Sequence, residues 1–404
     1  MNVAKMAPPL LSALQELGDG APIRVIVRYR EAPPPPDRLV VKAADVRTYR
    51  LIPATALQTT PEGVRALSED PAVERIWLDE WVHTCLDVSV PLIRAPYVWE
   101  AGYRGRGIRV GLVDTGIDRD HPDFAGRILA GKSFVGGDFQ DDNGHGTHVA
   151  GILAGSGAAS GGRYEGVAPE ALLYVAKVLR ADGSGLMSHV MAGVEWAVDQ
   201  GAQVINLSLG GIGPCNGTDA LSELCDAAVE QGVVVCVAAG NAGPGAATVG
   251  PPGCARQVIT VGASTDTDEV ANFSSRGPTL DGRVKPDLVF PGVGIVSCRA
   301  RNTSMGTPLN EHYTTASGTS MATPHASGTA ALLLEAAPSL TPAQIKALLQ
   351  QTAVNLGLDP NTQGSGRADA FAAYQAISPQ PPTPPPPPGE PQGCLTALLR
   401  LLGG

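Results

Sequence analysis

Short apolar runs alternate with longer amphipathic runs over most of the chain. Between residues 86 and 377 the short runs are strand-like, such as IRVGLVD, QVINLSL and VVVCVAAGN. The longer runs between them, such as HVMAGVEWAVDQG and MATPHASGTAALLLEAA, have helical length and spacing. Apolar strands that alternate with helices predict a mostly parallel central sheet with helices on both faces, which is a three-layer α/β fold.

The pattern changes on both sides of this region. Residues 23–85 predict a small α+β unit, with strand-like IRVIVRY and VERIWLD and a helix-like PEGVRALSED between them. Residues 1–22 precede it as an N-terminal extension. The proline-rich residues 378–393 predict an extended polyproline spacer, and residues 394–404 form a short apolar tail.

Composition narrows the class of protein. The 404 residues carry 29 basic and 39 acidic side chains, a formal net charge of −10, and 43% of them are apolar. This composition argues against a disordered chain, and the acidic balance gives no electrostatic basis for nucleic-acid binding. No apolar run reaches the roughly eighteen residues of a membrane-spanning helix, and the first residues contain no visible signal peptide.

Three segments each place one reactive side chain beside glycines. Asp114 ends the apolar strand in VGLVDTGID, His145 and His148 lie three residues apart in DDNGHGTHVAG, and Ser320 follows Gly318 before an Ala-rich helix. Taken singly, they read as a turn cap, a metal-binding or structural histidine pair, and a helix N-cap. Together they supply the nucleophile, base and orienting carboxylate that serine catalysis needs. A metal-dependent peptidase using both histidines is the alternative.

The motifs DTGID, HGTHVAG and GTSMATPH, in this order, resemble those of the subtilisin family of serine peptidases, the subtilases or peptidase S8 family. The similarity runs from about residue 93 to about residue 377 and implies a serine endopeptidase that acts through an acyl-enzyme. By resemblance, Asp114 is the orienting acid, His145 the general base and Ser320 the nucleophile. Asn241, in AAGN, matches the oxyanion-hole amide. No cofactor is needed for this chemistry.

The resemblance also implies where a protein or peptide substrate binds, as a strand added between two backbone segments. The expected substrate-binding residues are Gly183, Ser184, Gly185, Ser208, Leu209, Gly210, Ala238, Ala239, Gly240 and Gly250. None of them is charged. We therefore predict a preference for large apolar or aromatic P1 residues, with broad tolerance elsewhere.

Residues 23–85 resemble the inhibitory propeptide of secreted subtilisins, a ferredoxin-like α+β domain, most closely in RLIPA and DPAVERIWLDE. This resemblance implies a self-processing zymogen whose own propeptide is its intramolecular inhibitor. We expect the cut near Cys85 and Leu86. A permanent packing domain is the alternative.

A structural calcium ion is a further expectation from the family. Asp123, in DRDHPD, matches a carboxylate that binds calcium in many relatives. The loop that completes that site is replaced by GSGAASGGRYEGVAP, which lacks the usual asparagines. Asp138, Asp141 and Asp142 are candidates for another site.

The seven cysteines include no CxxC pair. Cys215 and Cys254 lie just beyond two walls of the pocket implied for P1, so we expect a disulfide between them that stiffens the pocket. Cys225 is the rival partner, and Cys236 reads as a buried thiol. A disulfide would place the protein in an oxidising compartment.

The remaining expectations concern context. The propeptide and the cysteines favour an extracellular location, and the absence of a visible signal peptide favours the cytoplasm as the alternative. We expect a monomer without a membrane span.

His148 and His325 belong to family motifs in structural positions. A catalytically silent peptide-binding scaffold is the alternative outside the enzymes, which the four intact catalytic positions argue against.

Overall fold

The computed structural model describes residues 2–377 except 7–9, 12, 15–17, 19, 50–51 and 80–85. The chain divides into two compact units, Met1–His83 and Thr84–Gly404. Cys85, on one side of the predicted cut, and the predicted spacer and tail at 378–404 lie outside the described residues.

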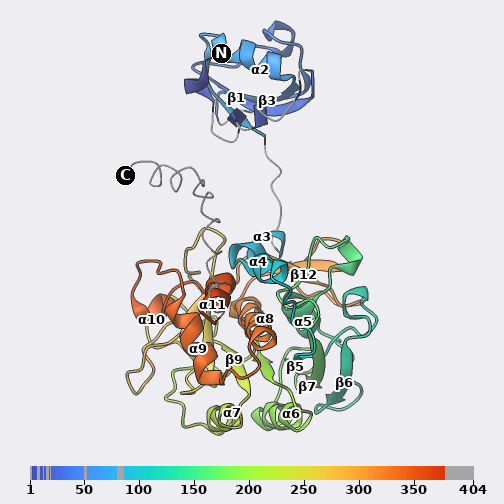
Figure 1. The fold of residues 1–404 in the computed structure, drawn as a ribbon, viewed down its shortest axis with the longest axis vertical. Coiled ribbons are helices and arrows are strands. Elements are labelled where there is room, and N and C mark those ends of the chain that lie inside the picture. The colour runs from blue at the N-terminus through green and yellow to red at the C-terminus, as the bar shows by residue number, and fades with distance from the viewer. Residues whose placement is uncertain are drawn as a thin grey trace, which may run out of the picture. The chain divides into compact units, whose positions relative to one another are not determined.

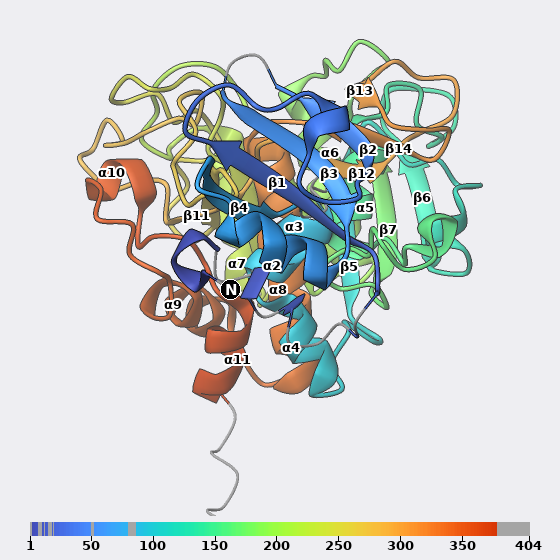
Figure 2. The same ribbon diagram turned by 90° about the horizontal axis from the view of Figure 1, so that it is seen from above.

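The first unit is an antiparallel sheet covered on one face by a helix (Figures 1 and 2). Its strand order is β2-β3-β1-β4, which is the order of the ferredoxin-like fold. Thr60 caps the helix by accepting a hydrogen bond from the Gly63 N–H at 3.2 Å. The elements are η1 (Val3–Lys5), β1 (Ile23–Tyr29), η2 (Pro36–Arg38), β2 (Ala44–Thr48), β3 (Ala54–Thr59), α2 (Pro61–Glu69) and β4 (Val73–Leu78).

The N-terminal residues are part of this first unit. Met6, Leu10 and Leu14 are buried in the same core as Val25 and Ile76. The boundary that composition suggests at residue 23 therefore divides one packed unit, because apolar side chains before it complete the core.

The second unit is built on a seven-stranded sheet in the order β11-β10-β9-β8-β5-β7-β6, and every pairing in it is parallel. The central strands are buried from end to end, as their continuous apolar runs predict. The strands are β5 (Arg109–Asp114), β6 (Ile128–Ser133), β7 (Leu172–Lys177), β8 (Val204–Leu207), β9 (Val234–Ala238), β10 (Ile259–Ser264) and β11 (Leu288–Pro291). A small antiparallel sheet adds β12 (Ile295–Cys298), β13 (Thr307–Pro308) and β14 (Tyr313–Ala316).

Helices cover both faces of the parallel sheet, which confirms the predicted three-layer α/β fold. Figure 1 shows α6 and α7 on one side of β5, β7 and β9, with α5 and α8 on the other. In both views α9 and α10 lie on the side opposite β6 (Figure 2). The helices are α3 (Leu86–Leu92), α4 (Ala95–Glu100), η3 (Pro122–Phe124), α5 (His145–Ala154), η4 (Ala158–Ser160), α6 (Met187–Asp199), α7 (Ala220–Glu230), α8 (Thr319–Ala336), α9 (Pro342–Gln351), α10 (Pro360–Gln363) and α11 (Ala370–Ile377).

The carboxyl ends of the parallel strands place the predicted site residues along one edge of the sheet. Asp114 ends β5, Ser208 follows β8, and Asn241 comes shortly after β9. In parallel sheets this edge is where ligands bind, because loops from several strands converge there. No helix among the described residues has the length and apolar character needed to cross a membrane.

Candidate active site

Asp114 is held rigidly at the end of a buried strand. Its side chain is fully buried, and Oδ1 accepts a hydrogen bond from the Thr115 N–H at 2.7 Å. The chain then turns at Gly116, which has a φ of 109° and approaches the Phe139 carbonyl too closely for any Cβ. Strand and turn together fix the direction of the carboxylate.

His145 is the first residue of α5, directly after Gly144. Its Nδ1 lies 2.7 Å from Oδ1 of Asp114, so the ring donates to the carboxylate and leaves Nε2 to accept a proton. Burial opposes protonation of the ring, but the charge and hydrogen bond of Asp114 outweigh it and raise the pKa of His145. The side chain keeps 22% of its surface exposed, so it remains accessible to a substrate.

The loop before His145 is organised by Asp141, which is buried. Its Oδ1 accepts from the Thr115 hydroxyl at 2.9 Å and from the Gly144 N–H at 2.8 Å, and its Oδ2 accepts twice from Thr147. These bonds tie the turn after β5 to the start of α5. The carboxylate is satisfied by donors of the chain itself and is not oriented toward a cation.

Ser320 is the second residue of α8 and is joined to Ser208 by two hydrogen bonds. The Ser320 hydroxyl donates to the Ser208 carbonyl at 3.0 Å, and the Ser208 hydroxyl donates to the Ser320 carbonyl at 2.9 Å. The second bond is available because Pro324, four residues on, has no N–H to offer that carbonyl. The Ser320 hydroxyl is therefore bonded to Ser208 here and not to the His145 ring.

Asn241 lies beside Ser320 with its carbonyl oxygen occupied. Thr319 donates both its N–H and its hydroxyl to Oδ1 of Asn241, at 2.9 and 3.0 Å. An amide held by its oxygen must direct its NH₂ group elsewhere, and Asn241 lines the same cavity as Ser320. The amide oxygen of Asn241 therefore faces Thr319, and its NH₂ group is left for the cavity.

Two adjoining cavities contain all the predicted substrate-binding residues. The first, of about 500 Å³, includes His145 together with residues 183–185 and Ser208. The second, of about 360 Å³, includes Ser320, Asn241, residues 238–240 and Gly250. Leu209, Gly210 and Gly211 line both, so the two cavities are parts of one cleft.

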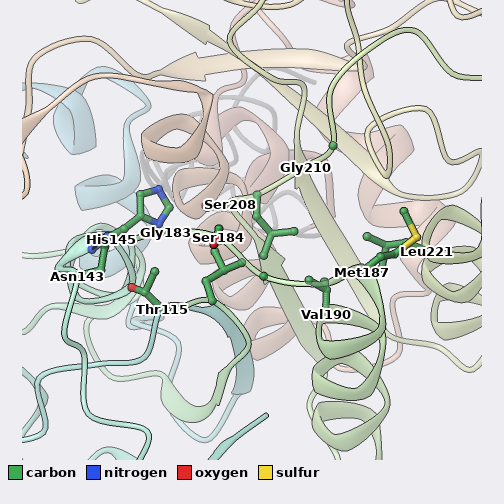
Figure 3. Close-up of a pocket in the computed structure, with 14 residues that line it drawn as sticks. Thr115, Asn143, His145, Gly183, Ser184, Met187, Val190, Ser208, Gly210 and Leu221 are labelled. Carbon is green, nitrogen blue, oxygen red and sulfur yellow. Dashed lines mark hydrogen bonds between the residues drawn. The ribbon is translucent and has the colours of Figure 1, made fainter. Parts of the chain in front are cut away.

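The two cavities differ in what lines them. Figure 3 shows Met187, Val190 and Leu221 gathered at the end of the first cavity away from His145 and Asn143. None of the described residues that line the second cavity is charged. Sequence reasoning missed Met187, Val190 and Leu221, and also Thr248, Ser275 and Thr319 in the second cavity. Of these, only Met187 had a local indication, since it lies two residues after Gly185.

The two other motif histidines are buried within the protein core. His148 Nε2 lies 3.1 Å from the Ile295 carbonyl and 3.2 Å from the Thr314 carbonyl. Burial lowers the pKa of His148 to about 3 and that of His325 to about 4, so both rings are neutral at ordinary pH. Nε2 of His148 faces two carbonyls, so it donates to them and is not a metal ligand, whereas Nδ1 is buried without a hydrogen-bond partner.

Asp123 does not have the surroundings of a calcium ligand. Its Oδ1 accepts from the Ala159 N–H at 2.9 Å, and its Oδ2 accepts from the Tyr313 hydroxyl at 2.9 Å and the Cys298 thiol at 3.4 Å. Calcium requires six to eight oxygen ligands, whereas these neighbours are hydrogen-bond donors that already satisfy the carboxylate. The other acidic candidates are also engaged: Asp138 with Arg119 and Asp142 with Lys177.

Cys215 and Cys254 form a disulfide with a Cα–Cα separation of 5.9 Å, as the sequence predicts. Cys225, the rival partner, is a free buried thiol, and so is Cys236. The disulfide connects the segment after Gly211 to the segment after Gly250. It therefore joins two walls of the second cavity.

Known proteins are similar to this chain in sequence and fold. The peptidase S8 model, described as the subtilase family, matches residues 105–368. Serine protease AprX of Bacillus subtilis is 40% identical over 350 residues, 80% of this chain and 79% of that protein. Subtilisin DY of Bacillus licheniformis is 41% identical over 291 residues, 71% of this chain and 98% of that protein.

A solved structure agrees with these relatives. The crystal structure of a cold adapted subtilisin-like serine proteinase matches with a TM-score of 0.53 and 36% identity, over 66% of this chain and 88% of that one. The family model covers more than half of the chain, and the relatives are similar over most of their own length. The chain therefore belongs to the subtilase family of serine-type endopeptidases.

Proposed function

We propose that this endopeptidase cleaves peptide bonds with Asp114, His145 and Ser320 as its catalytic residues. The observation that carries the proposal is the 2.7 Å hydrogen bond between His145 Nδ1 and the buried Asp114 carboxylate, on a histidine that lines the same cleft as Ser320. The carboxylate fixes the tautomer in which Nε2 is the base and stabilises the imidazolium that forms. Apo hydrogen bonds to a nucleophile often form only with substrate bound, so the present bond of Ser320 to Ser208 is compatible with this role.

Each proton and bond of the proposed reaction is accounted for. The Ser320 oxygen attacks the substrate carbonyl while its proton passes to His145 Nε2. The same proton then goes to the departing amine as the C–N bond breaks and the acyl-enzyme forms. Water then attacks the acyl carbonyl and gives a proton to His145 Nε2, and His145 returns this proton to the Ser320 oxygen as the ester C–O bond breaks and the acid leaves. The steps use side chains of the chain and no cofactor.

The developing oxyanion would be stabilised by two donors, the Asn241 amide and the Ser320 backbone N–H. Thr319 supports the first, because it holds the amide oxygen and leaves the NH₂ group for the cleft. Donors fixed before the reaction stabilise the transition state without reorganising during it.

Large apolar or aromatic residues are the proposed preference at P1. The second cavity adjoins Ser320, has a volume of about 360 Å³, and has no charged side chain among its described lining residues. Met187, Val190 and Leu221 in the first cavity would take a second apolar side chain of the extended substrate (Figure 3). Polar residues at other substrate positions would be tolerated.

The first unit is proposed to be a propeptide that Ser320 removes by cutting near Cys85 and Leu86, and that inhibits the enzyme until it is degraded. The ferredoxin-like strand order of this compact unit supports the proposal. An extracellular location for the mature monomer is supported by the Cys215–Cys254 disulfide, since such bonds persist in oxidising compartments.

The test compares intact mass and casein hydrolysis for the full chain and its Ser320→Ala variant, each with calcium or with a chelator. We expect the wild type to lose about its first 85 residues and digest casein in both conditions, and Ser320→Ala to stay full-length and inert. A variant that still matures and cleaves would exclude Ser320 as the nucleophile. Chelator-sensitive chemistry would favour the metal-dependent alternative.

A further inference from the structure

One arginine outside the cleft connects two walls of the second cavity. Arg283 is about three-quarters buried, and its Nη2 donates to the Asn216 carbonyl and to the Cys254 carbonyl, each at 2.8 Å. Asn216 belongs to the wall that continues from Gly211, and Cys254 to the wall that continues from Gly250. A single NH₂ group therefore bridges the two segments.

Arg283 is itself fixed by a tight turn. Its Nε donates to Oδ2 of Asp281 at 2.9 Å, and its backbone N–H donates to the Thr279 hydroxyl at 3.0 Å. The same turn contacts the first wall directly, because the Leu280 N–H donates to the Cys215 carbonyl at 3.0 Å. The guanidinium is thus held in place by its own turn.

The two walls that Arg283 connects lie very close together. A Cβ on Gly217 would lie 2.6 Å from the Cys254 carbonyl, so the two walls approach to backbone distance beside the guanidinium. Closer to the cavity the Gly211 N–H donates to the Pro251 carbonyl at 2.7 Å, and the disulfide adds a covalent connection. Most of these residues are glycine, cysteine or loop residues, which do not hold a shape without such connections.

We propose that Arg283 is a positioning residue for P1 recognition. By bonding both walls at once, it sets the width of the second cavity, which is the P1 pocket. The proposal rests on the proposed function, in which the second cavity receives P1. A planar guanidinium holds two carbonyls in a fixed relation, which a lysine ammonium or a neutral amide does less well. Small displacements in a substrate pocket reduce kcat/KM by an order of magnitude or more.

Arg256 provides a matched control. It also pairs with Oδ2 of Asp281, at 3.0 Å, but its guanidinium is more exposed and bonds neither Asn216 nor Cys254. Loss of Arg256 therefore perturbs the same ion-pair network and leaves the bridge between the walls intact.

The experiment measures kcat and KM of the mature enzyme on two peptide p-nitroanilides that differ only in Phe or Ala at P1. Arg283→Gln should lower kcat/KM for the Phe substrate about tenfold, mainly through KM, and change the Ala substrate by less than about threefold. Arg256→Gln should leave both within about twofold. The rate of Ser320 sulfonylation by methanesulfonyl fluoride, which carries no group that fills the P1 pocket, should be equal in all three proteins.

An unchanged Phe-to-Ala ratio in Arg283→Gln, or the same change in Arg256→Gln, would overturn the proposal. Should Arg283→Gln not fold, Arg283→Lys tests the same point, and an unchanged ratio there would also overturn it. Failure of the proposed function looks different, since the wild type would then be neither sulfonylated nor active on either substrate.

Discussion

Thr319 donates two hydrogen bonds to the same oxygen of Asn241, one from its N–H and one from its hydroxyl. The two residues are 78 positions apart and come from different elements, the loop after β9 and the start of α8. The residue directly before the proposed nucleophile thus orients the proposed oxyanion donor. The proposed nucleophile and the proposed oxyanion donor are therefore positioned by the same helix terminus.

Asn241→Ala should lower kcat by about 10²–10³-fold, the loss known for removing the corresponding donor from a subtilisin, with little change in KM. Thr319→Val removes the hydroxyl's bond to Asn241 and the bond that this hydroxyl accepts from the Gly240 N–H at 3.2 Å, but keeps the Thr319 N–H bond, so we expect a smaller fall in kcat, about tenfold. Thr329→Val is the control, because its hydroxyl bonds only the His325 carbonyl inside the same helix. Equal losses in Thr319→Val and Thr329→Val would indicate a general effect on the helix.

The pH dependence of the reaction follows from His145. The base must be neutral to accept the Ser320 proton, and Asp114 raises its pKa above the usual 6.5. We therefore expect kcat/KM to rise with pH through a value above 6.5 and to be lost below it. Asp114→Asn should reduce kcat about 10⁴-fold and move the remaining inflection to lower pH, because the stabilising charge is gone. If the inflection did not move in Asp114→Asn, the pH profile would not arise from the His145–Asp114 pair.

Much of the cleft could be predicted from the sequence, because its motifs resemble those of a known family and the reactive residues stand in recognisable local patterns. Asp114 ends an apolar run, Ser320 begins an Ala-rich helix, and the glycines beside them mark sharp turns. The role of Thr319 could not be predicted in this way, since its partner lies in another element. Arg283 likewise connects residues that are distant in the sequence: Asn216 is 67 positions away and Cys254 is 29.

The surroundings of Asp123 could not be predicted for the same reason. The family resemblance implied a cation ligand, but Tyr313 and Cys298, which bond its carboxylate, follow 190 and 175 residues later. Similarly, composition separated residues 1–22 from the first unit, although Leu10 is buried in that unit's core. The surroundings of a side chain and the limits of a packed unit depend on contacts between distant segments, which a local sequence pattern does not reveal.

Calcium should therefore not act through Asp123. We expect Asp123→Asn to lower the Tm, because an amide cannot accept all three hydrogen bonds, but to leave the difference in Tm between calcium and chelator equal to that of the wild type. Thermal unfolding of the Ser320→Ala background avoids self-digestion during the scan. A calcium response present in the wild type and absent from Asp123→Asn would restore this residue as a ligand.

Acid should destabilise the folded protein through its buried histidines. The pKa values of His148 and His325, about 3 and about 4, lie below the unfolded value of about 6.5, so unfolding takes up protons between these limits. Their stabilising contribution is complete above pH 6.5 and decreases as the pH falls, by about 1.4 kcal/mol per pH unit for each ring.

The slope of unfolding free energy against pH, measured by denaturant titration in the Ser320→Ala background, isolates this effect. His325→Gln should flatten the slope between about pH 6 and pH 4.5 by the contribution of one ring. Ser89→Ala removes the partner of His325 Nε2 but leaves the ring buried, so it should lower stability and keep the slope. A slope equally steep in His325→Gln would assign the acid sensitivity to other groups.

Ala247 carries backbone strain in the loop that also contains Asn241 and lines the second cavity through Thr248 and Gly250. Its φ of 54° is left-handed, a conformation that costs a residue with a Cβ about 1–2 kcal/mol. Ala247→Gly should relieve this strain against a smaller entropic loss and raise the free energy of unfolding by about 0.5–1 kcal/mol. Ala246→Gly, at a neighbouring position without a positive φ, should lower it. Denaturant unfolding of both variants in the Ser320→Ala background measures the difference. If Ala247→Gly were instead as destabilising as Ala246→Gly, the loop would not be strained at this residue.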